Sequence, residues 1–319
     1  MAIFRLLKSQ KIRLKADEYS TAASYRADLY QEISGRVEYK LVLSVSLRLE
    51  QINRGPYWFT LDYDGKMFWI QNWTEAEWTR LLNGAFAAAA FWNNRIWLVP
   101  PNAFTDFDQP IATGMSWRPF IKCEPAVDFF AFGFEPDAVI KIAKLDPDPV
   151  LNPAGGDFRS SSRLLVDTAI GTRAFTVPDA YGARTSYQQP TFVHEIGHNL
   201  GLHHVGVARG APLCKTAVNL VNFPQDALPW EFQGGSGAPV CYGWGHLPDF
   251  SKNIEGYGSA LSAENANPWI WAITMMTTGP YGIWKAVLPS SDPGTRFVEG
   301  HNSSVEFSQA MGYDLTHSL

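Results

Sequence analysis

The sequence predicts an α+β protein with a twisted, mixed sheet, and three observations support this class. Residues 37–49 alternate apolar with mostly polar side chains, which is the two-residue period of a strand with one buried face. Thr74 and Glu77 have the spacing of a capping box, which begins a helix. A second helix is expected from Pro190, because proline suits the first turn of a helix. With 319 residues, 46% of them hydrophobic, the chain can bury a large core.

Most of the elements before Pro190 are predicted to be strands. The exception at the N-terminus is residues 17–34, which are expected to form a helix within an N-terminal helical extension of residues 1–35. Asp64-Gly65 predicts a hairpin turn, and the helix capped by Thr74 is expected to reach about Trp92. Strands are predicted at residues 37–49, 57–63, 67–71, 95–99, 126–134 and 138–145, with one or two edge strands within residues 163–177.

The second half of the chain is expected to contain more irregular structure. The helix at residues 190–200 is followed by residues 205–274, which are rich in Pro, Gly, Trp and Asn. That stretch is long for a connection and should form one wall of a cleft. A last helix with its own capping box is expected at residues 303–312. The main domain is therefore predicted to span residues 36–319.

Residues 194–204 read His-Glu-Ile-Gly-His-Asn-Leu-Gly-Leu-His-His, and five of them have the spacing of a catalytic metal site. These five are His194, Glu195, His198, Gly201 and His204. They would coincide by chance on the order of once in 10⁵ chains of this length and composition. In a helix the first two histidines lie at i and i+4 on one face, so both rings can point at one metal ion. The glutamate lies beside that face, where it can take a proton from a metal-bound water.

The third histidine requires the helix to end. If the helix continued, His204 would lie about 9 Å further along its axis than His198, too far for a zinc–nitrogen bond of about 2.0–2.1 Å. Gly201 can adopt the left-handed conformation that ends a helix and turns the chain back. Three histidines with an open fourth position are typical of a catalytic zinc ion. His203 is the neighbouring alternative ligand, and we expect it to face outward.

The pattern H-E-x-x-H-x-x-G-x-x-H resembles that of the metzincin clan of zinc metallopeptidases, without indicating a subfamily. The resemblance implies a zincin fold with a twisted sheet and two helices above the cleft (residues 36–204). It also implies an irregular lower part (residues 205–319) with a Met-turn beneath the zinc and a C-terminal helix. Met276 is the expected methionine and Met275 the alternative. Tyr281 is a possible oxyanion stabiliser, although it does not stand two residues after the methionine, where some metzincins place such a tyrosine.

The predicted activity is that of a zinc-dependent endopeptidase. Glu195 is expected to assist the attack of zinc-bound water on a peptide bond of an extended protein substrate, which would pair with the edge strand within residues 163–177. One alternative is a delivered effector or toxin protease that cleaves one target protein. Another is a non-catalytic binding module that keeps zinc as a scaffold, against which the intact Glu195 argues.

The remaining histidines, acids and cysteines give weaker signals. His246, His301 and His317 are expected to be bystanders, and Ca²⁺ binding by a loop with Asp146, Asp148 and Asp157 is possible but unsupported. Cys214 and Cys241 either form a disulfide or remain thiols. Cys123 has a faint similarity to the cysteine switch of some metzincin proenzymes, but a buried structural thiol is expected.

Composition limits the partners. The net charge of −5 gives no reason to expect nucleic acid as a partner, and no apolar run has the length of a transmembrane helix. Residues 1–16 carry five cations without the apolar core of a secretory signal. An extracellular protein, or one delivered into a target cell, is favoured over a resident of the cytoplasm. The oligomeric state is not predicted.

Overall fold

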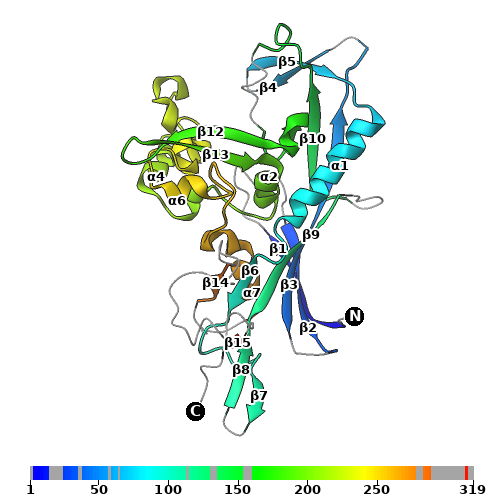
Figure 1. Ribbon diagram of the computed structural model, residues 1–319, viewed down its shortest axis with the longest axis vertical. Coiled ribbons are helices and arrows are strands. Elements are labelled where there is room, and N and C mark those ends of the chain that lie inside the picture. The colour runs from blue at the N-terminus through cyan, green and yellow to red at the C-terminus, as the bar shows by residue number, and fades with distance from the viewer. Residues whose placement is uncertain are drawn as a thin grey trace.

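Figure 1 shows the computed structural model of the chain, a mixed α+β structure in which a long sheet lies beside a lobe of short helices. The residues that it describes are 3–13, 24–34, 38–56, 59–63, 65–112, 115–129, 135–153, 160–277, 283–288 and 313–314. The sheet contains both parallel and antiparallel pairs. The predicted class is therefore confirmed.

The centre of the sheet is β3 (Tyr39–Ile52), the strand predicted from alternation. Its apolar side chains from Tyr39 to Leu47 are buried at every second position, and their neighbours are partly exposed. It pairs in parallel with β9 (Ile121–Asp128) and β10 (Ala138–Leu145). The strand predicted at residues 126–134 therefore begins earlier, at Ile121, and residues 130–134 lie outside the described part.

The other strands extend the sheet on both sides, in the order β14-β6-β9-β3-β10-β5-β4. The predicted hairpin is confirmed: β4 and β5 pair antiparallel, and Gly65 has a φ of 68° in the turn. On the β9 side of β3, β6 pairs antiparallel with β9, and β14 pairs antiparallel with β6. On the β10 side, β11 pairs in parallel with β10. Their bounds are Thr60–Tyr63 for β4, Lys66–Gln71 for β5, Ile96–Val99 for β6, Leu164–Val166 for β11 and Lys285–Val287 for β14.

The prediction of an N-terminal helix at residues 17–34 is wrong. β1 (Phe4–Arg13) and β2 (Ser24–Glu32) form an antiparallel pair instead, and β2 pairs with β3. Tyr25, Ala27 and Leu29 are buried on one face of β2, and this two-residue period is the signal that favours a strand over a helix. The described residues before β3, 3–13 and 24–34, thus contribute two strands to the sheet and do not form the expected helix.

Two helices, α1 and α2, position the site. α1 (Glu75–Ala90) begins at the predicted capping box of Thr74 and Glu77 and packs Leu81, Ala85 and Ala88 into the core. It contacts α2 (Thr191–Asn199), which lies between the sheet and the lobe in Figure 1. The chain enters α2 from a separate hairpin of β12 (Thr172–Pro178) and β13 (Arg184–Pro190). Before the helix at Pro190 the sequence predicts strands only up to residue 177, so β13 is not predicted.

Residues 205–277 contain the lobe of short helices and the helix α7 that follows it. The α-helices are α3 (Val205–Ala208), α4 (Pro212–Asn219), α5 (Pro239–Tyr242), α6 (Pro248–Lys252) and α7 (Asn267–Met276). Turns of 3₁₀-helix in this segment are η3 (Gln225–Ala227), η4 (Trp230–Phe232), η5 (Gly235–Gly237) and η6 (Ala263–Ala266). A further turn, η2 (Asp167–Ile170), lies between β11 and β12. A small sheet contains β7 (Gln109–Ala112), β8 (Met115–Pro119) and β15 (Tyr313–Asp314). Among the described helices, none has the length and hydropathy of a membrane span.

Candidate metal centre

The metal centre is built on α2, whose residues from Thr191 to Asn199 are all buried. Pro190 is the residue just before the helix, and Leu200 ends it. Gly201 then has a φ of 93°, in the left-handed region that favours glycine. The amide of Gly201 donates to the carbonyl of His198 and that of Leu202 to the carbonyl of Gly197, which is the Schellman ending. The turn predicted from Gly201 therefore returns the chain towards the helix.

This turn brings three histidine rings together. The Nε2 atom of His198 lies 3.1 Å from Nε2 of His194 and 3.2 Å from Nε2 of His204. All three side chains are buried, and they form the group among the described residues that could hold a metal ion. Two nitrogens bound to one tetrahedral zinc ion at about 2.05 Å lie about 3.3 Å apart. The spacing in the structure therefore fits one ion at the centre of the three rings.

The outward nitrogens of the rings fix which nitrogen carries the proton. Nδ1 of His194 lies 2.7 Å from the carbonyl oxygen of Ile254, that of His198 lies 2.8 Å from Leu202 and that of His204 lies 2.8 Å from Ser236. A carbonyl oxygen only accepts, so each Nδ1 donates and each neutral ring presents an Nε2 lone pair to the other two.

Three converging lone pairs repel one another unless a cation lies between them. Burial, together with the neighbouring histidines, holds the pKa values of His194 and His204 well below the usual range. Protonation of these two rings is therefore not the favoured way to relieve the repulsion between the lone pairs. The donor set and its orientation therefore fit a bound metal ion.

Glu195 lies beside the ligands and lines a pocket. Its side chain is 4% exposed, and burial raises the pKa of its carboxyl to about 8. A carboxylate with a raised pKa beside a metal site is a good proton acceptor and donor near neutral pH. The structure thus places the predicted base next to the predicted ligands.

The segment of residues 253–258, which we call the support loop, contacts the ligands and was missed by sequence analysis. The carbonyl of Ile254 accepts from His194, and the carbonyl of Glu255 accepts from the amide of Val205, the residue after His204. The Glu255 side chain is buried, with a carboxylate oxygen 3.4 Å from Nδ1 of His194 and 3.6 Å from Nδ1 of His198. No spacing in the sequence relates Glu255 to the motif, so only the fold reveals it.

A pocket of about 240 Å³ extends from Glu195 between the β12–β13 hairpin and the lobe. Its aromatic lining comprises Phe175, Trp230, Tyr242, Trp244 and Tyr257. The Tyr242 ring centroid lies 3.8 Å from that of His204, so the pocket wall is continuous with the ligand cluster. The pocket can enclose a large apolar group next to the base.

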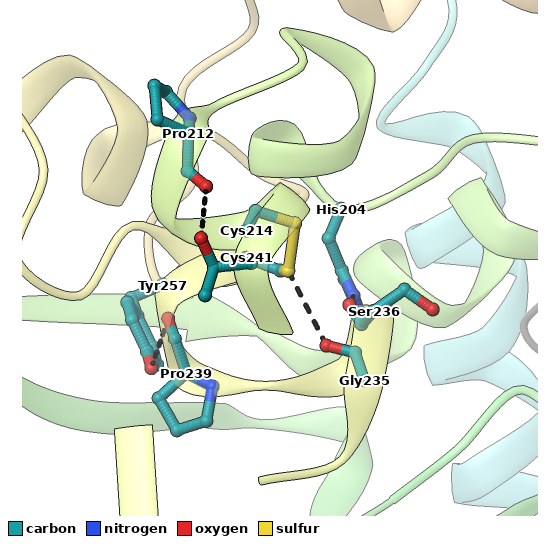
Figure 2. Close-up of a disulfide and its surroundings, with 9 residues drawn as sticks. His204, Pro212, Cys214, Gly235, Ser236, Pro239, Cys241 and Tyr257 are labelled. Carbon is teal, nitrogen blue, oxygen red and sulfur yellow. Dashed lines mark hydrogen bonds between the residues drawn. A yellow bond between two sulfur atoms is a disulfide. The ribbon is translucent and has the colours of Figure 1, made fainter. Parts of the chain in front are cut away.

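Cys214 and Cys241 form a disulfide, which closes the open question from the sequence. The bond joins α4 to α5 beside the segment that carries Gly235 and Ser236, and Figure 2 shows His204 next to this segment. Cys241 also precedes Tyr242, whose ring packs on His204. The disulfide therefore holds together the part of the lobe that supports the third ligand.

We expect replacement of both Cys214 and Cys241 by serine to destabilise the lobe and weaken metal binding at His204. The loop closed by this bond has a sequence separation of 27 residues, and the loss of such a crosslink costs about 3 kcal/mol. Thermal unfolding of the metal-free wild type and the double variant measures the first effect, and zinc titration measures the second. Wild type treated with a reductant should behave like the double variant; identical unfolding midpoints with and without the disulfide would contradict this expectation.

The other candidate residues do not belong to the group of three histidines or lie outside the described part. Met276 is buried at the end of α7, and Met275 is 45% exposed. Both methionines lie in a helix and not in a turn, so the Met-turn stays a prediction. His203 is half-buried next to His204, which is the residue that joins the cluster. Tyr281, Asp157, His301, His317 and the helix expected at residues 303–312 lie outside the described residues.

Cys123, His246 and the acidic loop have other surroundings. Cys123 is a buried free thiol in β9, as expected for a structural residue. The His246 ring stacks on Phe250. Asp146 accepts hydrogen bonds from Gln71 and from the amide of Asp148, so its carboxylate stabilises the loop, and calcium binding stays a prediction.

Comparisons of this chain with protein-family models, with curated proteins and with solved structures found no significant match to any of the three.

Proposed function

We propose that this protein is a zinc-dependent endopeptidase with a metzincin-like fold. The observation that carries the proposal is the cluster of three Nε2 lone pairs, with an acidic side chain of raised pKa beside it. Zinc is favoured because an all-imidazole set of three ligands with an open fourth position suits it. When bound, the ion supplies a Lewis acid that activates water and polarises a carbonyl group.

The side chains of this chain have distinct roles in the proposed hydrolysis. His194, His198 and His204 bind the ion, and the carbonyls that accept from their Nδ1 atoms keep the rings in the binding tautomer. Glu195 removes a proton from the attacking water and transfers it to the leaving amine. Burial of Glu195 keeps bulk water away from this transfer. It also raises the pKa of the Glu195 carboxyl to about 8, which brings it closer to the pKa values of the attacking water and the leaving amine.

The pocket and the hairpin beside it suggest how a peptide would lie. The aromatic lining beside Glu195 suits a large apolar or aromatic side chain next to the scissile bond. Within the described residues β12 pairs only with β13, so its other edge can pair with an extended substrate. The disulfide favours an oxidising compartment, such as the exterior of a cell.

A peptide library digested by the zinc-loaded protein tests the proposal. We expect cleavage that a chelator abolishes and zinc restores, with enrichment of Phe, Tyr, Trp or Leu at one position beside the cut, as mass spectrometry of the new termini would show. If the protein binds zinc but cleaves no peptide in a diverse library, a zinc-scaffolded binding module replaces the peptidase. If cleavage in a whole proteome is confined to one protein, the enzyme is a dedicated effector protease.

A further inference from the structure

Glu255 is a buried acid that has no role in the proposed hydrolysis. Its side chain is 1% exposed, and among the described residues neither carboxylate oxygen has a hydrogen-bond partner. A buried carboxylate without hydrogen bonds is costly. Its place against two of the ligand rings therefore needs an explanation.

The carboxylate packs against α2, on the side of the Nδ1 atoms of its two ligand histidines. Its Oε2 atom approaches Nδ1 of both His194 and His198, at 3.4 and 3.6 Å. Its Oε1 atom occupies the space above Gly197, where a Cβ atom would lie only 2.0 Å away. The glycine between the two ligands thus makes room for the carboxylate.

The support loop holds Glu255 firmly in this place. Asn253 accepts from the amide of Glu255 at 2.7 Å and exchanges hydrogen bonds with Asn265. The carbonyl of Gly256 accepts from Gln189 at the end of β13. A Cβ atom at Gly256 would lie 2.4 Å from the carbonyl oxygen of Phe250, so the loop is closely packed. The position of the carboxylate is therefore set by the fold.

We infer that Glu255 is a positioning residue of the metal centre, whose carboxylate lies behind two ligand rings and, acting through them, increases the affinity of the site for a divalent cation. The inference rests on the metal binding in the proposed function but not on catalysis. The geometry carries it: the Glu255 carboxylate lies within 3.6 Å of the non-ligating nitrogens of two ligand rings. Carboxylates beside the non-ligating nitrogen of metal-bound histidines typically change metal affinity by about 10–100-fold.

The test is a competition titration of zinc against a chromophoric chelator, with thermal unfolding of each metal-free protein. For Glu255→Gln we expect a zinc dissociation constant at least about tenfold higher than in the wild type. The unfolding midpoint of the metal-free variant should be no lower than that of the wild type, because no hydrogen bond of the carboxylate is lost. Glu264→Gln is the matched control: this half-buried glutamate pairs with Arg209, and its replacement should leave the zinc affinity unchanged.

Gly197→Ala provides a second variant, because its methyl group would displace the Glu255 carboxylate without removing it. It should weaken zinc binding in the same direction. Zinc affinity within twofold of the wild type in Glu255→Gln would overturn the inference and leave the proposed function standing. A metal-free Glu255→Gln protein that unfolds far below the wild type would overturn it too, since the residue would then be purely structural. A wild type that binds no zinc would remove the proposed function itself.

Discussion

Replacing Glu195 by glutamine is expected to reduce the rate of peptide hydrolysis about 10³-fold while zinc binding is retained. Glutamine has nearly the same shape, so it fills the same buried space, but it cannot accept and return a proton. General acid–base catalysis typically contributes about 10²–10⁴-fold to a rate. The measurements are kcat/KM on a peptide found in the library and zinc content per chain.

Glu264→Gln is again the control for this change, because Glu264 is paired with Arg209 rather than placed beside the ligands. Its activity should equal that of the wild type. A Glu195→Gln protein that cleaves at the wild-type rate would show that another group transfers the proton, and the proposed mechanism would then be wrong.

Removal of zinc is expected to lower the unfolding midpoint by about 6 °C. Without the ion, three Nε2 lone pairs face one another, and two acidic side chains are buried beside them. With free zinc at a thousand times its dissociation constant, binding stabilises the folded state by about 4 kcal/mol. In a chain of this length that energy corresponds to a shift of several degrees. Thermal unfolding with zinc and with a chelator measures the difference.

His198→Ala should abolish this zinc-dependent shift, because His198 lies between the other two rings. His246→Ala makes the same change outside the cluster, where the ring stacks on Phe250, and should keep the shift. If the shift survived in His198→Ala, the stabilising zinc would be bound elsewhere.

The site was predictable because its ligands are close in sequence. His194 and His198 depend only on the period of one helix, and His204 depends on a single turn that Gly201 makes possible. The regular strands were predictable for the same reason: β3 shows its buried face in an uninterrupted alternation. Local periodicity therefore gave both the main strand and the ligand set.

The remaining features depend on contacts between distant residues. Glu255 meets His194 only through the fold, and Ser236 meets His204 in the same way. The incorrect helix prediction at β2 has a local cause: the run Ser24–Glu32 is short and Asp28 stands among its apolar residues, which obscures the two-residue period of the strand.

X-ray absorption spectroscopy of the zinc-loaded wild type tests the central claim most directly. The account predicts one zinc ion per chain with three imidazole nitrogens at about 2.0–2.1 Å and one further oxygen ligand. A zinc ion with fewer than three imidazole ligands, a shell that contains sulfur, or a purified protein that retains no zinc from a zinc-supplemented, chelator-free buffer would contradict it.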